Sequence, residues 1–290
     1  SDDPMILYAA IEAIGILGDE NSVELLLPFL DSKDTAISES AMYSIINISE
    51  SNNGKLDVDL PLDRFSGFLF DGIKNRNKKL TKFTLERLKH WYGKDILRSL
   101  LEVLHYVDED DLQDIVKMLG EIGPSASGLI LEQFESANSD LKLIYLSILK
   151  QYIDAEISQH LIKHHRDSDP DVRRMIAQIL GISGNNEAVE TLKLMTQDKI
   201  GHVRSAAFGA LGWLLSETEI DTLVCGLDDK YPDVREAVRG ALVLIGTDKV
   251  VNLFSSDLYH DDIERQRLAV TALGLIGDKS VVDSLLQAIN

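Results

Sequence analysis

The chain of 290 residues carries 29 Lys and Arg against 48 Asp and Glu, a formal net charge of −19, and 44% of its residues are hydrophobic. This apolar fraction excludes a disordered chain, and the negative charge disfavours nucleic acids and anionic membranes as partners. The single cysteine, Cys225, excludes an internal disulfide and a multi-cysteine zinc site, and its apolar neighbours predict that it is buried.

No apolar stretch approaches the roughly 18 residues that a membrane span needs, and no secretory leader opens the sequence. We therefore expect a cytoplasmic protein without a membrane association. Because the sequence starts at Ser1 and not at a methionine, we also expect it to be a segment of a longer protein.

An interval of 31 residues recurs along the chain. Arg173, Arg204 and Arg235 lie 31 residues apart, and a leucine follows each of them seven residues later. Extended in both directions, the interval marks nine equivalent positions: Leu7, Ser38, Thr81, Leu112, Lys142, Arg173, Arg204, Arg235 and Gln266. A fixed period of this length predicts a repeat array, and hence one domain over residues 1–290.

The repeats differ in clarity along the chain. They are clear over residues 1–30 and 140–290 and weaker over 31–139, where Ser38, Thr81 and Leu112 stand in place of the arginine. The longest step, from Ser38 to Thr81, predicts an insertion near residues 51–64. Turn-forming residues 51–54, and Pro61 with the nearby aspartates, predict an exposed loop there.

Residues 169–198 show how one repeat is built. Pro170 and Asp171 are typical of a helix start, and Gly184 with Asn185 is typical of a helix end. Between them the apolar residues recur at helical spacing: Val172, Ile176, Ile179, Leu180 and Ile182. A second amphipathic stretch runs from Ala188 to Asp198, so the unit is a helix–turn–helix.

Glycine recurs at one helical phase. The glycines at this phase are Gly15, Gly120, Gly181 and Gly274. Because glycine inside a helix costs about 1 kcal/mol relative to alanine, its repeated use predicts a close approach of neighbouring helices. Each pair alone cannot bury its apolar face, so the pairs must stack.

These residues resemble HEAT-like repeats, in particular the short 31-residue type named after phycobilisome lyases. The resemblance is carried by an Asp six residues before each Val-Arg and by Ala-Leu-Gly-Leu-Ile-Gly-Asp at residues 272–278. It implies an all-α fold, a right-handed α-solenoid of about nine helix pairs, whose Val-Arg helices line the concave side. It also implies a ladder along the inter-repeat turns, formed by Asp167, Arg173, Asp198, Arg204, Asp229 and Arg235.

The repeated arginine has two interpretations. A row of arginines could bind anions, but each has an aspartate six residues before it, and Asp171 and Asp233 add a second carboxylate at two of them. Arginine and carboxylate pair strongly and fix geometry. We therefore interpret the arginines as structural.

No set of residues predicts catalysis or a cofactor. The sequence has no Gly-rich phosphate loop, no Gly-x-Ser-x-Gly and no His-Glu dipeptide. His160 and His164 share one face of a helix, with Glu156 one turn earlier, and could hold zinc or nickel. Two ligands seldom suffice, so we assign no metal site and keep this pair as a weak candidate.

The concave face is the predicted binding surface. Positions +1, +2, +5 and +9 from the repeated position point away from the apolar face. They include Tyr8, Glu12, Tyr43, Phe83, Glu86, His90, Lys117, Arg174, Met175, Gln178 and Trp213. Aromatic residues, methionine and arginine are enriched at interface cores, although some of these side chains could instead turn inward to fill gaps.

We expect a non-catalytic scaffold or regulatory module that binds a protein or peptide segment in its concave groove. The net charge favours a basic or amphipathic partner. The alternative is a bilin lyase-like subunit that acts in chromophore attachment, which the resemblance allows. A nucleic-acid-binding HEAT array, as in some DNA glycosylases, conflicts with the charge.

Overall fold

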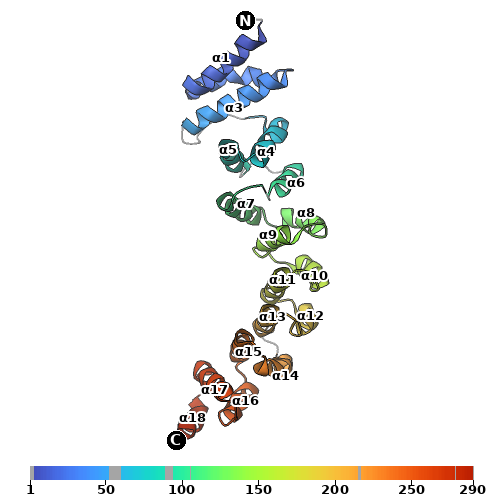
Figure 1. The fold of residues 1–290 in the computed structure, drawn as a ribbon, viewed down its shortest axis with the longest axis vertical. Coiled ribbons are helices and arrows are strands. Elements are labelled where there is room, and N and C mark those ends of the chain that lie inside the picture. The colour runs from blue at the N-terminus through green and yellow to red at the C-terminus, as the bar shows by residue number, and fades with distance from the viewer. Residues whose placement is uncertain are drawn as a thin grey trace. The chain divides into compact units, whose positions relative to one another are not determined.

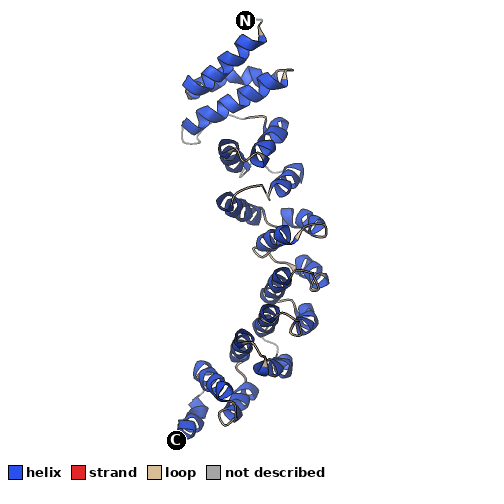
Figure 2. Cartoon of the chain, viewed as in Figure 1, coloured by secondary structure: helices blue, strands red, loops and turns tan. Residues whose placement is uncertain are grey.

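The computed structural model describes residues 3–51, 60–88, 94–104, 106–214, 217–277 and 279–289. Over these ranges the chain forms helices joined by turns, without any β-strand (Figure 2). None of the described helices is both long and apolar enough to cross a bilayer. Residues 52–59, most of the predicted insertion, lie outside the described residues.

The repeated positions all lie in odd-numbered helices. Each position is the fourth residue of its helix: α1 (Pro4–Leu17), α3 (Thr35–Ser51), α5 (Lys78–Leu88), α7 (Glu109–Ile122), α9 (Ser139–Leu149), α11 (Pro170–Ile182), α13 (Gly201–Trp213), α15 (Pro232–Ile245) and α17 (Ile263–Ile276). An even-numbered helix follows each: α2 (Glu20–Leu26), α4 (Ser66–Lys74), α6 (Lys94–Val103), α8 (Pro124–Phe134), α10 (Ala155–Lys163), α12 (Val189–Met195), α14 (Ile220–Val224), α16 (Asp248–Asp257) and α18 (Val282–Ile289). Short 3-10 helices complete the described chain: η1 (Leu27–Asp31), η2 (Leu62–Phe65), η3 (Asn186–Ala188), η4 (Glu217–Glu219), η5 (Cys225–Asp228) and η6 (Lys279–Val281). Over the described ranges, the predicted all-α solenoid of nine helix pairs is confirmed (Figure 1).

Contacts divide the chain into two units, residues 1–130 and 131–290. In the first unit α1 packs against α3, α3 against α5, and α4 against both α5 and α6. In the second unit α9, α11, α13, α15 and α17 pack one against the next. There the even-numbered helices α10, α12, α14 and α16 each contact the odd-numbered helix that follows. Each unit is therefore a stack of helix pairs.

The helix start and helix end predicted within residues 169–198 are present in the structure. Asp169 caps α11, since its carboxylate accepts hydrogen bonds from the backbone N–H of Asp171 and Val172 at 2.8 and 3.4 Å, and Pro170 is the first helical residue. The helix ends at Ile182, and Gly184 follows with a φ of +66°. Glycine adopts this left-handed conformation without strain, so the chain can reverse into the second helix of the pair.

Glycines at the predicted phase bring backbones into contact. A Cβ added to Gly181 would lie 2.6 Å from the Cβ of Ala210, and one added to Gly212 would lie 2.5 Å from the Cα of Ala241. Gly15 meets Ser44 of α3 in the same way, at 2.5 Å from its Oγ. Gly274 has no neighbour within 4 Å of its added Cβ. The predicted close approach therefore holds at Gly15 and Gly181 and not at Gly274, and Gly212 makes the same kind of contact.

Two glycines of α13 give a matched test of this contact. We expect Gly212→Ala to destabilise the protein by about 1–2 kcal/mol, because the methyl group collides with backbone atoms of α15. Gly209→Ala, about one turn earlier, has open space and should stabilise by up to about 1 kcal/mol through helix propensity. Thermal unfolding followed by circular dichroism measures both, and a rise in Tm for Gly212→Ala would contradict the contact.

Two local expectations are wrong. Cys225 is exposed, because it begins η5 after the short helix α14 and does not continue the buried face of that helix. Residues 62–65, which the sequence assigns to an exposed loop, form η2, and Phe65 is buried there. Phe65 and Leu62 both pack on the first unit's core, which orders this short stretch.

Candidate functional site

In the second unit, the predicted ladder consists of arginines near the start of odd-numbered helices and aspartates in the turns before those helices. Arg173 donates through Nε and Nη2 to both carboxylate oxygens of Asp198, at 2.7 and 3.0 Å. Arg204 does the same to Asp229, at 2.7 and 2.9 Å. Each arginine therefore pairs with the aspartate of the following repeat, and not with the carboxylate six residues before it.

The preceding aspartate contributes its backbone instead. Arg173, Arg204 and Arg235 each donate through Nη1 to the carbonyl oxygen six residues earlier, at 2.7 Å in all three cases. Gln266 makes the same hydrogen bond to the carbonyl of His260, at 2.7 Å. At the repeated position, arginine or glutamine thus closes its own turn, and Arg173 and Arg204 also link to the next turn.

The ladder also extends to a lysine and ends at a histidine. Lys142 binds Asp167 at 2.7 Å, in a pair whose side chains are 15% and 6% exposed. His260 stands where Arg235 would meet its aspartate, and Arg265 instead binds Asp257 and Asp228 at 3.0 and 2.9 Å. Arg265 therefore pairs with aspartates that precede it in the chain, whereas Arg173 and Arg204 pair with aspartates that follow them.

The aspartates of the ladder are stabilised in their charged form. Burial alone would raise the pKa of Asp198, but hydrogen bonds from Arg173 and from the backbone N–H of Ile200 outweigh it, so the pKa is lowered. Burial likewise opposes a lowered pKa at Asp167, where Lys142 dominates. The hydrogen bond from Arg204 is the main cause of the lowered pKa of Asp229.

In the first unit, part of the predicted surface lines a groove. Tyr8 and Glu12 of α1 and Tyr43 of α3 border a hollow of about 420 Å³, together with Ile16, Ala36, Glu39, Ser40, Ser44, Asn47 and Phe68. A hydrogen bond to the carboxylate of Glu12 is the main cause that raises the pKa of the Tyr8 hydroxyl. Tyr8 is exposed and Tyr43 is half-buried, so an aromatic edge is accessible there.

Glu86 and Lys117 lie together in a second, more polar hollow of about 390 Å³ between α5 and α7. Phe83 was expected on the surface but is buried and belongs to the first unit's core, because the +2 position of α5 turns toward Leu80 and Leu69. His90 lies outside the described residues. Glu86 and Lys117, both at position +5, are exposed, as is Asp114 at position +2 of α7.

In the second unit Arg174, Met175 and Gln178 are half-buried on α11, whereas Trp213 at the end of α13 is exposed. Trp213 belongs to a set at position +9 of four consecutive odd-numbered helices. These side chains, Ile182, Trp213, Leu244 and Leu275, are 44%, 49%, 53% and 61% exposed. We call them the apolar row. Sequence reasoning found only Trp213, although the other three have the same 31-residue period.

Two glycines lie next to the apolar row. Gly209 and Gly240 precede Trp213 and Leu244 by four residues, one helical turn on the same face. A Cβ added at either glycine would meet nothing within 4 Å. The side of these helices next to the row is therefore open to an approaching chain.

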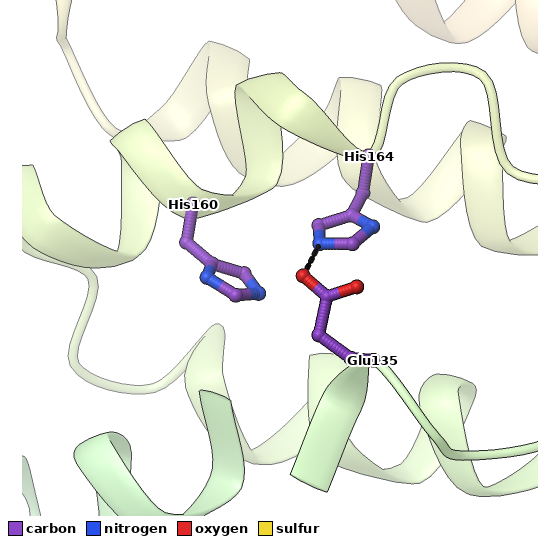
Figure 3. A group of neighbouring side chains, drawn as sticks. All are labelled: Glu135, His160 and His164. Carbon is purple, nitrogen blue, oxygen red and sulfur yellow. Dashed lines mark hydrogen bonds and ion pairs between the residues drawn. The ribbon is translucent and has the colours of Figure 1, made fainter. Parts of the chain in front are cut away.

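The structure brings His160 and His164 to a third ligand-forming residue, Glu135, which follows α8 (Figure 3). His164 Nε2 lies 3.1 Å from Glu135 Oε1, and the ring centroids of the two histidines are 4.8 Å apart. Glu156, expected one turn earlier, is not in this group. Burial, followed by the charge of His164, lowers the pKa of His160, so its imidazole is neutral near pH 7.

Comparisons with known proteins identify the repeats. Residues 158–243 match the family model of HEAT repeats, and residues 6–32 match that of the PBS lyase HEAT-like repeat. The crystal structure of an engineered protein is similar at 18% identity over 97% of this chain and 84% of that one, with a TM-score of 0.45. A designed armadillo repeat protein in complex with the peptide (KR)4 is 16% identical over 62% of this chain and 99% of that one, with a TM-score of 0.41. No curated protein matches the chain.

Proposed function

The chain is a HEAT-like repeat protein, and from that premise we propose that it is a non-catalytic scaffold that binds a protein segment along its odd-numbered helices. The apolar row is the single observation that carries this proposal. Isolated exposed apolar residues are ordinary on protein surfaces. Four at one phase on consecutive helices form a repeated surface feature, which is typical of an interaction site.

The spacing and charge of this surface favour a particular kind of partner. An amphipathic helix presents apolar side chains at intervals of three and four residues, which suits a surface with regularly placed apolar groups. Trp213 would supply the largest buried area, and tryptophan is enriched among residues that dominate binding energy. The net charge of −19 favours a partner with basic residues on its polar face.

A designed peptide pair tests the proposal. The probe is a Leu/Lys amphipathic helix labelled with a fluorophore, and a Leu/Glu peptide of the same apolar pattern controls for charge. We expect the wild-type protein to bind the basic peptide more tightly, and Trp213→Ala to weaken this binding about 30-fold, as loss of a dominant contact of about 2 kcal/mol would do. Fluorescence anisotropy at physiological salt gives the Kd.

Two leucines of equal exposure separate specific binding from general adhesion. Leu244 belongs to the apolar row, whereas Leu194 lies on the even-numbered helix α12, and both are 53% exposed. We expect Leu244→Ser to weaken peptide binding about tenfold and Leu194→Ser to leave it unchanged. Equal losses from the two variants would show that the peptide binds to any exposed apolar residue, and would contradict the proposal.

A further inference from the structure

Three side chains near the C-terminal ends of α8 and α10 have the composition of a metal site. Glu135, His160 and His164 each offer one ligand atom, and all these atoms lie within 4.8 Å of one another. His160 lies on α10, His164 caps the C-terminal end of that helix four residues later, and Glu135 follows the end of α8 in the same unit. Figure 3 shows the carboxylate turned toward the two imidazole rings.

One atom of this group is otherwise unexplained. The Nε2 atom of His160 is shut off from solvent and has no hydrogen-bond partner among the residues that the structure describes. A buried polar atom left in this state costs about 1–3 kcal/mol. Its ring stands beside that of His164, which already contacts Glu135, so a cation held between the three groups would satisfy it.

The rings are held in place before any ion binds. Phe134 is fully buried, and it packs edge-on against His160 and His164 with centroid distances of 5.9 and 5.1 Å. Removal of rotamer freedom in the unliganded state lowers the entropic cost of binding. Two of the three ligands are therefore oriented before a cation binds.

The surrounding helices favour positive charge. Glu135 directly follows the C-terminal end of α8, and His164 caps the C-terminal end of α10. The carbonyl ends of helices carry partial negative charge, so a cation bound by residues that follow two such ends is stabilised.

The geometry points to a site for a divalent transition-metal ion of the zinc class, bound by His160, His164 and Glu135. Imidazole nitrogens select zinc and its neighbours over magnesium and calcium, which prefer oxygen. A tetrahedral zinc ion holds its ligand atoms roughly 3.3 Å apart. The separations here, 3.1 Å for one pair and no more than 4.8 Å for any, reach that value after small side-chain rotations. Three protein ligands leave the fourth position for water.

Zinc titration against a chromogenic chelator tests the site, on full-length protein purified without a polyhistidine tag and stripped of metal. We expect one equivalent of Zn²⁺ per chain, which raises the Tm, and Co²⁺ in its place should give the visible absorption of a tetrahedral complex. Mg²⁺ and Ca²⁺ should not compete. His160→Gln and Glu135→Gln should each weaken zinc binding at least about tenfold.

The variants are chosen so that folding does not confuse the result. The Glu135 side chain is 66% exposed, so Glu135→Gln cannot act by disrupting the core. The matched control is His202→Gln, a partly exposed histidine on α13 outside the group, which should bind zinc as the wild type does. Zinc binding that survives Glu135→Gln and His160→Gln, or that His202→Gln removes equally, would overturn the site. Either result leaves the proposed peptide binding unaffected, because the apolar row lies on α11, α13, α15 and α17.

Discussion

Arg204→Met should lower the free energy of unfolding by about 3–5 kcal/mol, a large effect for a side chain at a turn. The substitution leaves the carboxylate of Asp229, only 12% exposed, without its two charged hydrogen bonds. It also removes the donor to the carbonyl of Asp198. An unpaired, largely buried charge is costly because protein cannot replace its hydration. Chemical denaturation with a constant m-value measures the change.

An exposed ion pair of the same length is the control. Lys249 and Asp221 lie 2.7 Å apart, as Arg204 and Asp229 do, but their side chains are 60% and 84% exposed. Lys249→Met should change the unfolding free energy by no more than about 0.5 kcal/mol, since water screens the pair. In the double variant Arg204→Met with Asp229→Leu we expect part of the loss to be recovered. Equal costs for Arg204→Met and Lys249→Met would contradict the importance of burial.

Acid should unfold the second unit through the same contacts. Asp167, Asp198 and Asp229 all have folded-state pKa values below the ordinary 3.8. The unfolded chain therefore takes up protons at a pH where the folded chain still does not. The stability from these groups is fully present above about pH 5 and is lost as the pH falls through the lowered pKa values. Each group contributes a slope of up to about 1.4 kcal/mol per pH unit in that window.

Denaturation midpoints measured from pH 6 to pH 2 give this slope. We expect Asp198→Asn to be less stable than wild type at pH 6, and its stability to depend less steeply on pH below 4 because one titrating group is gone. Asp221→Asn removes an exposed carboxylate and should leave the slope nearly unchanged. A slope that Asp198→Asn and Asp221→Asn alter equally would show that general charge repulsion, and not the ladder, governs acid unfolding.

The sequence predicts the helix pairs well because the period is carried by residues that stacking itself requires. Every repeated position, even Leu7, Ser38 and Thr81 where arginine is missing, is the fourth residue of a helix. The same reasoning locates Gly15 and Gly181 at helix contacts, since only a missing side chain permits that approach. Local spacing is sufficient for these features.

The partners of individual side chains are less accessible to sequence reasoning. Asp198 was expected to belong to Arg204, but the stacking of pairs brings it to Arg173, 25 residues away. Glu135 lies 25 and 29 residues from the two histidines, just after another helix, so no local pattern includes it. Phe83 has the same type of position as exposed residues elsewhere, and only the packing of α5 decides that it is buried. These outcomes depend on how neighbouring repeats fit together.

The residue at each helix contact also affects how the side chains of the apolar row are arranged. Gly181 and Gly212 allow α11, α13 and α15 to approach closely, whereas Val243 occupies the equivalent position on α15, and α17 packs less closely there. Ile182, Trp213 and Leu244 therefore lie on closely packed helices, whereas Leu275 lies on a helix that packs less closely against its neighbour. We expect a ligand to engage the first three side chains together and Leu275 less readily. The residue at one helix contact thus affects how long a binding motif this face can recognise.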